Sequence, residues 1–266
     1  MEKFVLVTGS TGGLGKEFCK VLASNNENLL LTGTNINRLQ DLKKELKEQY
    51  ENLNIEICEC DLSKESSRKE LFDFIENNQI SIKMLINNAG FITEGSIMNA
   101  TSDNLINCIR VNCEGVIDVT KFVLDRKVVS DNLDIITISS MAGDYPMPYM
   151  AIYASTKSFL TNFMSALRIE YSKQNVRVLV VKPGAIPTSQ EMKDAIKAQG
   201  FKGRLSSVGA DVIAKNSLKK IGKAKSYVPG FFNKITVFFS KFVTKNFQAK
   251  VVAKMWKKSQ EKRNIK

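Results

Sequence analysis

Tyr153 and Lys157 stand four positions apart in the run IYASTKSFL, a spacing that brings both side chains to one face if the run is helical. A fixed ammonium beside a phenol favours the phenolate. The pair is therefore expected to lower the tyrosine pKa from about 10 toward the range of a general acid or base. Ser140 ends an apolar stretch 13 residues upstream of Tyr153. These side chains together indicate proton transfer to or from a substrate oxygen.

A glycine-rich turn near the start of the chain indicates a site for nucleotide phosphates. The run VLVTGSTGGLGKEF places glycines at 9, 13 and 15, between a predicted strand and a predicted helix. Gly9 permits a sharp exit from the strand, Gly13 lets the backbone approach a pyrophosphate, and Gly15 lets the helix pack close to the sheet. The helix N-terminus then faces the phosphates. An ordinary glycine-rich turn would explain the same residues, but its place at the first strand of an alternating chain favours dinucleotide binding.

The elements that must position these residues alternate between strand and helix. Strands are predicted near 3–8, 28–32, 53–58, 83–87, 133–139 and 176–182, and helices near 13–25, 37–50, 65–77, 102–127, 152–174 and 208–222. This alternation predicts a single α/β domain, a Rossmann-like doubly wound parallel sheet with helices on both faces. Thr8, Asp61, Asn88, Ser140 and Pro183 all follow the C-terminal ends of predicted strands. Open α/β sheets bind their ligands at that edge.

Composition agrees with a cytoplasmic enzyme and excludes several chemistries. The 266 residues are 43% hydrophobic, enough to build a large core. The first apolar stretch breaks at Thr8-Gly9, unlike a signal peptide, and the five cysteines form no CxxC pair. The chain contains no histidine, which removes Ser-His-Asp hydrolysis and histidine-based zinc sites. We expect no metal site.

Residues 3 to about 190 resemble the short-chain dehydrogenase/reductase family, as a hydroxysteroid-dehydrogenase-like member. TGSTGGLG at 8–15 fits the family's TGxxxGxG cofactor turn, CDLS its adenine-contacting acid Asp61, and NNAG at 87–90 the motif beside the adenosine. RVNCEG with Asn112, ISSMAG with Ser140, and Tyr153 with Lys157 fit the catalytic tetrad, and PGAIPT at 183–188 fits the nicotinamide loop. The resemblance fails beyond about residue 225.

The resemblance implies that the chain interconverts a secondary alcohol and a ketone by hydride transfer. Tyr153 would act as general acid or base, and Lys157 would lower its pKa and hold the nicotinamide ribose. Ser140 would polarise the substrate oxygen, unless it merely caps the next turn, and Asn112 would hold a water that links Lys157 to solvent. The implied cofactor-binding residues are Gly9, Ser10, Thr11, Gly13, Leu14, Gly15, Thr34, Asn35, Arg38, Asp61, Leu62, Asn88, Ala89, Gly90, Tyr153, Lys157, Pro183, Gly184, Ile186 and Thr188.

The end of the second predicted strand, LLLTGTNINRL, favours NADP(H) over NAD(H). An acid there would hold the ribose 2′-hydroxyl of NAD and repel a 2′-phosphate. The first acid after this strand is Asp41, inside the next helix. Ser10, Thr34, Asn35 and Arg38 could hydrogen-bond the 2′-phosphate instead. NAD(H) remains an alternative because the two places where this family often clamps the phosphate carry no basic residue.

Residues 231–266 form a predicted C-terminal extension of a catalytic domain at 1–230. They carry ten lysines or arginines and one acid, net +9, which leaves +3 on residues 1–230. Six phenylalanines and the only tryptophan predict a basic amphipathic helix beside the substrate mouth rather than disorder. The helix either docks on the domain or contacts an anionic membrane surface through 231–256. Its lysines are too frequent for a bilayer span, and no recognition motif indicates nucleic acid.

The expected substrate mouth is apolar and rich in methionine, comprising Phe91, Ile92, Met141, Tyr145, Met147, Tyr149, Ile186 and Met192. It suits a bulky lipophilic alcohol or ketone such as a hydroxysteroid or bile acid, although hydrophobic loop residues that merely pack would look the same. Two other functions remain open. One is a membrane-associated reductase of lipids or long-chain ketones, and the other is an NADP(H)-sensing protein without turnover.

The helices near 102–127 and 152–174 predict a homo-oligomer. They carry apolar residues on more than one face, namely Val116, Val119, Val123, Phe159, Phe163 and Leu167. Part of each helix is therefore expected to be buried by a partner subunit. The resemblance implies the same pairing.

Overall fold

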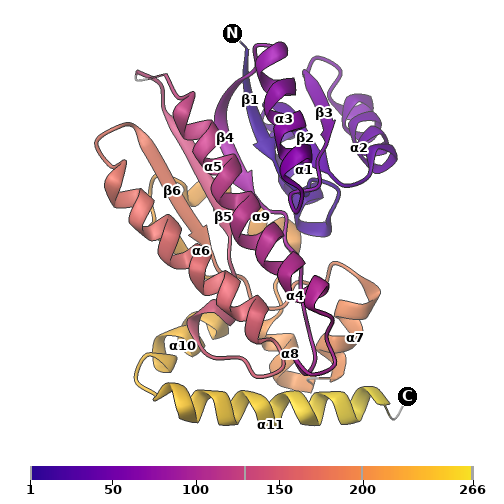
Figure 1. Cartoon of the computed structure of the whole chain (residues 1–266), viewed down its shortest axis with the longest axis vertical. Coiled ribbons are helices and arrows are strands. Elements are labelled where there is room, and N and C mark those ends of the chain that lie inside the picture. The colour runs from indigo at the N-terminus through magenta and orange to yellow at the C-terminus, as the bar shows by residue number, and fades with distance from the viewer. Residues whose placement is uncertain (1, 129, 199, 265–266) are drawn as a thin grey trace.

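The computed structural model describes residues 2–128, 130–198 and 200–264, and within them seven parallel strands form one sheet in the order β3-β2-β1-β4-β5-β6-β7 (Figure 1). The strands are β1 (Lys3–Val7), β2 (Asn28–Gly33), β3 (Ile55–Glu59), β4 (Ser81–Asn87), β5 (Leu133–Ile138), β6 (Val176–Val181) and β7 (Ser226–Tyr227). The strand order reverses between β1 and β4, and β1 pairs with both β2 and β4 in parallel register. Ligands bind outside the carboxyl ends of strands at such a reversal.

Helices cover both faces of the sheet, so the predicted fold class is confirmed. They are α1 (Gly13–Ser24), α2 (Ile36–Gln49), α3 (Glu65–Asn77), α4 (Ser102–Ile109), α5 (Gly115–Asp125), α6 (Ala151–Glu170), α7 (Gln190–Ala198), α8 (Gly200–Ser206), α9 (Ala210–Lys220), α10 (Phe231–Ser240) and α11 (Lys245–Asn264). A π-helical turn η1 (Arg110–Glu114) joins α4 to α5, and a 3₁₀ turn η2 (Met141–Asp144) follows β5.

Two elements differ from the sequence prediction. The single helix expected near 102–127 is interrupted by the π turn η1, whose widened hydrogen bonding no hydrophobic pattern reveals. The single helix expected over 231–266 is instead α10 followed by α11. The side-chain amide of Gln248, near the start of α11, donates to the carbonyls of Ser240 and Val243. It thereby satisfies backbone carbonyl groups that have no helical partner where α10 ends.

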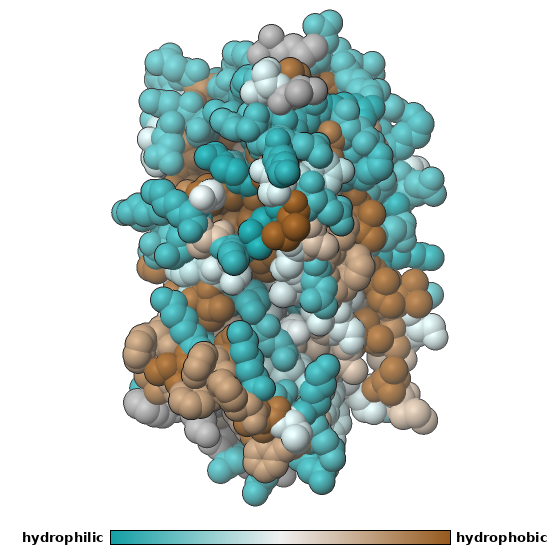
Figure 2. Space-filling model, turned by 90° about the vertical axis from the view of Figure 1, so that its left-hand side faces the viewer, coloured by the Kyte–Doolittle hydropathy of each residue, from teal (hydrophilic) through white to brown (hydrophobic). Residues whose placement is uncertain are grey.

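The C-terminal helices lie beyond the carboxyl ends of the strands. Figure 1 shows α11 running across that end of the molecule, with α10, α7 and α8 between it and the sheet. Helix α11 packs on α7, and α10 packs on α8 and η2. Figure 2 shows apolar residues gathered over the same end, with hydrophilic residues between them. None of the described helices is long and apolar enough to cross a bilayer.

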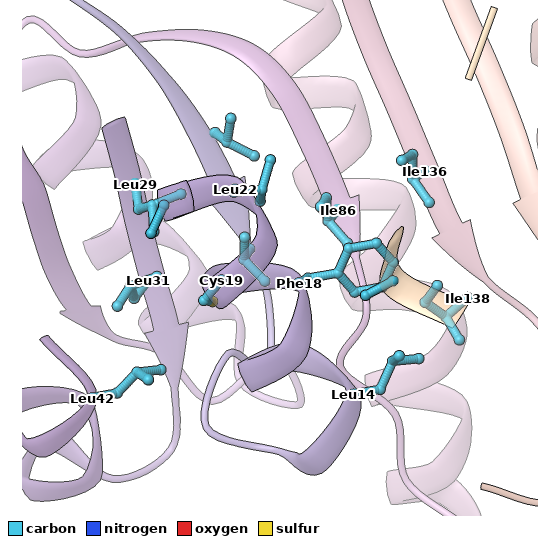
Figure 3. Close-up of a cluster of buried hydrophobic side chains, with 14 of the residues drawn as sticks. Leu14, Phe18, Cys19, Leu22, Leu29, Leu31, Leu42, Ile86, Ile136 and Ile138 are labelled. Atoms are coloured by element: carbon cyan, nitrogen blue, oxygen red, sulfur yellow. The ribbon is translucent and has the colours of Figure 1, made fainter. Parts of the chain in front are cut away.

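The sheet separates two layers of buried side chains because successive residues of a strand point to opposite faces. Val5 and Val7 of β1 face one layer with α1, α2 and α9, whereas Phe4 and Leu6 face the other with α3, α5 and α6. In Figure 3 the Phe18 ring of α1 lies against Ile86 and Ile138, at the ends of β4 and β5. Packing of α1 against these strands fixes the glycine turn that precedes it.

Candidate active site

A cleft of about 910 Å³ opens at the carboxyl ends of β1 to β6. The predicted site residues that line it are Gly9, Thr11, Gly13, Leu14, Thr34, Asp61, Leu62, Asn88, Ala89, Gly90, Ser140, Tyr153, Lys157, Pro183, Gly184, Ile186 and Thr188. The cleft thus brings together predicted residues from seven separate chain segments. Ser10, Gly15, Asn35, Arg38 and Asn112 were also predicted but are not among its lining residues.

The glycine turn fits a phosphate group. Gly9 has a φ of +62°, and a Cβ there would lie 2.8 Å from the Cα of Ala89. A Cβ on Gly13 would lie 2.4 Å from that of Thr188, so this turn and the 183–188 loop meet directly. Helix α1 begins at Gly13 and no side chain caps its N-terminus. Its first N–H groups therefore remain available to an anion in the cleft.

Asn88 joins the glycine turn to the end of β4. Its Nδ2 donates to the carbonyls of Thr8 and Gly9, each at 3.0 Å. The Thr8 hydroxyl accepts from the backbone N–H groups of Asn88 and Ala89 at 3.0 and 3.1 Å. The side chain of Asn88 is therefore occupied in holding the two segments together, so its role in cofactor binding is to position the backbone around it.

The residues predicted to hold a 2′-phosphate do not all face the cleft. The Ser10 hydroxyl is buried and donates to the Thr32 carbonyl at 3.1 Å, so it is not free to bind phosphate. Asn35 caps α2, its Oδ1 accepting from the Arg38 N–H at 3.0 Å. Arg38 is exposed on the first turn of α2. Thr34 is the one of the four that lines the cleft.

Asp61 and Lys64 line the cleft just after β3, the strand that lies beside β2. The Asp61 Oδ1 accepts from the Ser63 N–H and hydroxyl, and its Oδ2 lies 3.4 Å from the Lys64 ammonium. Partial burial raises the pKa of Asp61, but these hydrogen bonds outweigh it and hold the pKa below its usual range. Lys64 lines the cleft and was not predicted. A single exposed lysine carries no sequence pattern that could have identified it.

Tyr153 and Ser140 lie together in the cleft. Burial raises the pKa of Tyr153, and a hydrogen bond with the Ser140 side chain offsets only part of that rise. The expected lowering of the tyrosine pKa is therefore wrong for this geometry, because loss of hydration on burial outweighs the hydrogen bond from Ser140. A buried phenol that keeps its proton is suited to donate it. The Ser140 hydroxyl also accepts from the Ala142 N–H at 3.1 Å.

Lys157, one turn after Tyr153 on α6, places its ammonium near the Tyr153 ring. Its Nζ lies 5.8 Å from the centre of the Tyr153 ring and donates to the Ile138 carbonyl at 2.8 Å. Burial lowers the pKa of this ammonium to about 8. Neighbouring Ser139 also lines the cleft, but its hydroxyl is committed to donating to the Lys157 carbonyl at 2.7 Å. Ser140, 13 residues before Tyr153, is the serine whose side chain hydrogen-bonds Tyr153.

Asn112 occupies the π turn η1, beside rather than in the cleft. Its Oδ1 accepts from the Phe91 N–H at 2.8 Å, and its Nδ2 donates to the Phe91 carbonyl at 2.9 Å and to the Thr156 hydroxyl at 3.0 Å. The side chain is therefore committed to protein partners. It fixes the backbone at Phe91, which lines the cleft. π turns occur frequently at functional sites.

The predicted apolar mouth is divided between two cavities. Phe91, Ile92, Ile186 and Met192 line the main cleft. Tyr145 and Met147 instead line a second cavity of about 430 Å³. Met141 is buried, and Tyr149 stacks on Trp256 of α11. Among the described residues, no group of three or more cysteine and acidic side chains could hold a metal ion.

Comparisons with known proteins agree with this geometry. A family model described as short chain dehydrogenase matches residues 3–199. A very-long-chain 3-oxoacyl-CoA reductase of Neurospora crassa is 33% identical over 190 residues, which are 70% of this chain. The matched region covers 57% of that relative, so the chain spans little more than half of its length.

Two solved structures share the fold. A 7β-hydroxysteroid dehydrogenase superposes with a TM-score of 0.82 and 21% identity, covering 95% of this chain and 96% of the other. A short-chain dehydrogenase from Sphingobium yanoikuyae in complex with NADPH gives a TM-score of 0.73 and 24% identity, covering 86% and 87%. The first of these matches extends over nearly the whole chain.

Proposed function

Because the chain belongs to the short-chain dehydrogenase family, an oxidoreductase family, we propose that it interconverts a secondary alcohol and a ketone with a nicotinamide cofactor. The observation that carries this proposal is the meeting of Ser140, Tyr153 and Lys157 in a cleft that also contains the glycine turn. Reduction of a ketone needs a proton donor at the carbonyl oxygen and a bound hydride donor beside it. The cleft has residues suited to both tasks.

The residues of the chain would divide these tasks as follows. The nicotinamide would supply the hydride to the substrate carbon. Tyr153 would donate its proton to the substrate oxygen, and Ser140 would hydrogen-bond that oxygen and hold it in place. The Lys157 ammonium would hydrogen-bond the nicotinamide ribose, and Asn112 would position the backbone at Phe91. The uncapped start of α1 would face the diphosphate, and Asp61 the adenine.

NADP(H) is the proposed cofactor. Thr34 and Asn35 stand where an acid would bind the 2′-hydroxyl of NAD, and a 2′-phosphate would meet no repelling charge from them. Lys64 adds an ammonium to the wall of the same end of the cleft. Thr11 and Thr34 supply hydroxyls there. Ser10 no longer belongs to the phosphate-binding set because its hydroxyl is committed to Thr32.

The proposed substrate is a bulky lipophilic alcohol or ketone such as a hydroxysteroid or bile acid. Phe91, Ile92, Ile186 and Met192 give the cleft an apolar wall near Tyr153. Two of the similar proteins are named for a hydroxysteroid and for a very-long-chain 3-oxoacyl-CoA, and the steroid skeleton and the long acyl chain are both apolar. The second of these also favours an alternative substrate class, a long-chain ketone drawn from a membrane.

A ketone panel tests the proposal. Purified protein is mixed with NADPH and with ketosteroids, long-chain ketones and small ketones, and the loss of NADPH absorbance is followed. Reduction of the bulky apolar ketones at a higher kcat/KM than the small ones supports it. Tight NADPH binding without turnover on any ketone would instead identify a cofactor-sensing protein.

A further inference from the structure

Helix α10 carries apolar side chains on both of its faces. Its inner face is already packed. Val237 is buried there, and the buried Asn233 donates through Nδ2 to the carbonyls of Ser206 and Pro229 at 2.9 and 2.7 Å. Its outer face consists of Phe231, Ile235, Phe238 and Phe239, whose exposed fractions are 79%, 37%, 56% and 61%. Phe242, in the turn after the helix, is 73% exposed. Docking of α10 on the domain therefore leaves a second, aromatic face uncovered.

Helix α11 repeats this arrangement. Trp256 faces inward and stacks on Tyr149, with the ring centres 4.0 Å apart. Phe247, Val251 and Met255 follow one another at four-residue spacing on an exposed face, with exposed fractions of 60%, 41% and 46%. We call the outward residues of the two helices and of the turn after α10 the tail surface: Phe231, Ile235, Phe238, Phe239, Phe242, Phe247, Val251 and Met255. Exposed apolar residues gathered in this number mark an interaction site.

Lysines alternate with the tail surface, and no acid stands among them. Lys234, Lys241, Lys245, Lys250, Lys254, Lys257 and Lys258 are all exposed, and the chain has no aspartate or glutamate between 231 and 260. Within the described residues, none of these ammonium groups lies in ion-pair distance of a carboxylate. Their charge is therefore left for a partner that is not part of this chain.

We propose that the tail surface docks on an anionic membrane. Phenylalanines that enter the boundary between headgroups and acyl chains, with lysines at the headgroup level, are the composition of an interfacial amphipathic helix. A second copy of the chain fits less well, because it would bring a like charge of +9 on residues 231–266 against the first. Nucleic acid fits less well because Ile235, Val251 and Met255 cannot stack on bases as aromatic rings do.

The docked orientation places the mouth of the cleft at the membrane. The tail surface lies on the end of the molecule to which the strands point their carboxyl ends (Figures 1 and 2). The inner face of α11 contacts the mouth through Trp256, which stacks on Tyr149 and donates to Glu94 Oε1 at 3.1 Å. A lipophilic substrate dissolved in the bilayer would thus reach Tyr153 with a short path through water. This consequence for substrate, but not the docking itself, rests on the proposed function.

Vesicle flotation of the full-length protein tests the proposal. The probes are vesicles of phosphatidylcholine alone and of phosphatidylcholine with phosphatidylserine, at low and high salt. One variant combines Phe238→Ser, Phe239→Ser and Phe242→Ser, and its control combines Met98→Ser and Ile169→Ser, which are exposed but lie outside the tail. A second variant combines Lys241→Gln, Lys250→Gln and Lys254→Gln. Its control, Lys215→Gln with Lys219→Gln and Lys223→Gln, loses the same three charges elsewhere.

The proposal predicts flotation with the anionic vesicles that weakens at high salt. The lysine variant should lose on the order of 100-fold in partition coefficient, since each lysine near such a surface contributes about 1 kcal/mol. The phenylalanine variant should lose at least about tenfold, and both controls should float like the wild type. Thermal unfolding checks that all variants are folded.

Four outcomes would overturn the docking. The first two are no flotation of the wild type and equal losses in controls and variants. The third is a wild type that does not float and whose particle mass falls in the phenylalanine variant, which would assign the surface to self-association. The fourth is binding of the wild type to an oligonucleotide in preference to vesicles. Turnover of the ketone panel described above, bulky and small, is measured with the same protein preparations in the absence of vesicles. Docking without turnover would reject the proposed function alone, and turnover without docking would reject this inference alone.

Discussion

Trp256 stacks on Tyr149 with the ring centres 4.0 Å apart and the planes 13° apart. The C-terminal helix α11 thereby contacts two loops at the mouth of the cleft, because the Trp256 indole also donates to Glu94. Tyr149 has a φ of +69°, unusual for a bulky residue, and its carbonyl accepts from the Gly95 N–H at 2.7 Å. The tail therefore holds a strained residue of the mouth in place.

Trp256→Ala should impair bulky substrates more than small ones. Loss of the aromatic pair costs about 0.5–1.5 kcal/mol and releases Tyr149, so KM for bulky apolar ketones should rise about twofold to tenfold. Steady-state kinetics on a bulky and a small ketone measure this. Phe247→Ala on the exposed face of α11 is the matched control. Equal changes for both ketones, or the same change in the control, would contradict the role given to the stack.

Tyr153→Phe should remove turnover and keep cofactor binding. The substitution deletes the transferable proton and little volume, and loss of one general acid typically costs about 10²–10⁴ in rate. NADPH fluorescence titration and the ketone assay measure the two effects separately. Tyr145→Phe is a suitable control, since Tyr145 lines the second cavity. Activity close to wild type in Tyr153→Phe would exclude the proposed mechanism.

The sequence predicted the sheet and most of the cleft because both follow from local patterns. Alternating apolar runs located β1 to β6, and the motifs that follow these strands had to meet at one edge of a parallel sheet. Short elements without a long apolar repeat were missed, among them β7, α7 and α8. The π turn was missed because it changes hydrogen bonding and not residue periodicity. Lys64 was missed because a single exposed lysine carries no pattern.

NADPH should bind more tightly than NADH, and Thr34→Asp should reverse the order. A carboxylate at the end of β2 would repel the 2′-phosphate and accept from the 2′-hydroxyl of NAD. Dissociation constants for both cofactors, measured by fluorescence, test this in both proteins. Asn37→Asp, in the first turn of α2, adds the same charge nearby as a control. Equal dissociation constants in the wild type would show that the missing acid does not decide the preference.

Lys64→Gln should weaken NADPH binding more than NADH binding. Lys64 is 68% exposed at the wall of the cleft, so its attraction for a 2′-phosphate is screened and should fall further as salt rises. We expect a loss of about twofold to fivefold for NADPH and little change for NADH. Titrations at two salt concentrations measure it. Lys16→Gln, on α1 outside the lining residues, is the control.

The pKa of Lys157 makes stability depend on pH in a defined window. Burial lowers it from 10.5 to about 8, so between these values the unfolded chain binds more protons than the folded one and stability rises with pH. Lys157→Met removes this dependence. The unfolding free energy of wild type minus that of the variant should therefore increase by on the order of 3 kcal/mol as pH rises through the window. Denaturant titrations measure it, and a flat difference would contradict the burial.

Other side-chain properties were beyond the sequence because they depend on competition among neighbours. Spacing alone placed Tyr153 beside Lys157, but it could not weigh burial against charge, and burial decided the tyrosine pKa. The Ser10 hydroxyl looked free in the sequence and is committed to Thr32. The sequence could not say which tail residues dock on the domain and which remain on the outer surface. The structure shows that α10 and α11 each have one apolar face that packs on the domain and a second that is exposed.

The prediction of a homo-oligomer needs different evidence from the residues that first suggested it. Val116, Val119, Val123 and Leu167 are buried within the single chain, so they do not require a partner. Ile117 of α5 and Phe159 of α6 remain 41% and 37% exposed, on the side of the sheet opposite α9.

We expect the wild type to be a homo-oligomer at micromolar concentration and Ile117→Glu with Phe159→Glu to be a monomer, because a partner would have to bury two unpaired carboxylates. Light scattering coupled to size exclusion measures the mass of each. Val212→Glu on α9 is the control, since Val212 is 43% exposed on the other face of the domain. A monomeric wild type would exclude the homo-oligomer. A control that dissociates as much as the double variant would show that Ile117 and Phe159 do not define the interface.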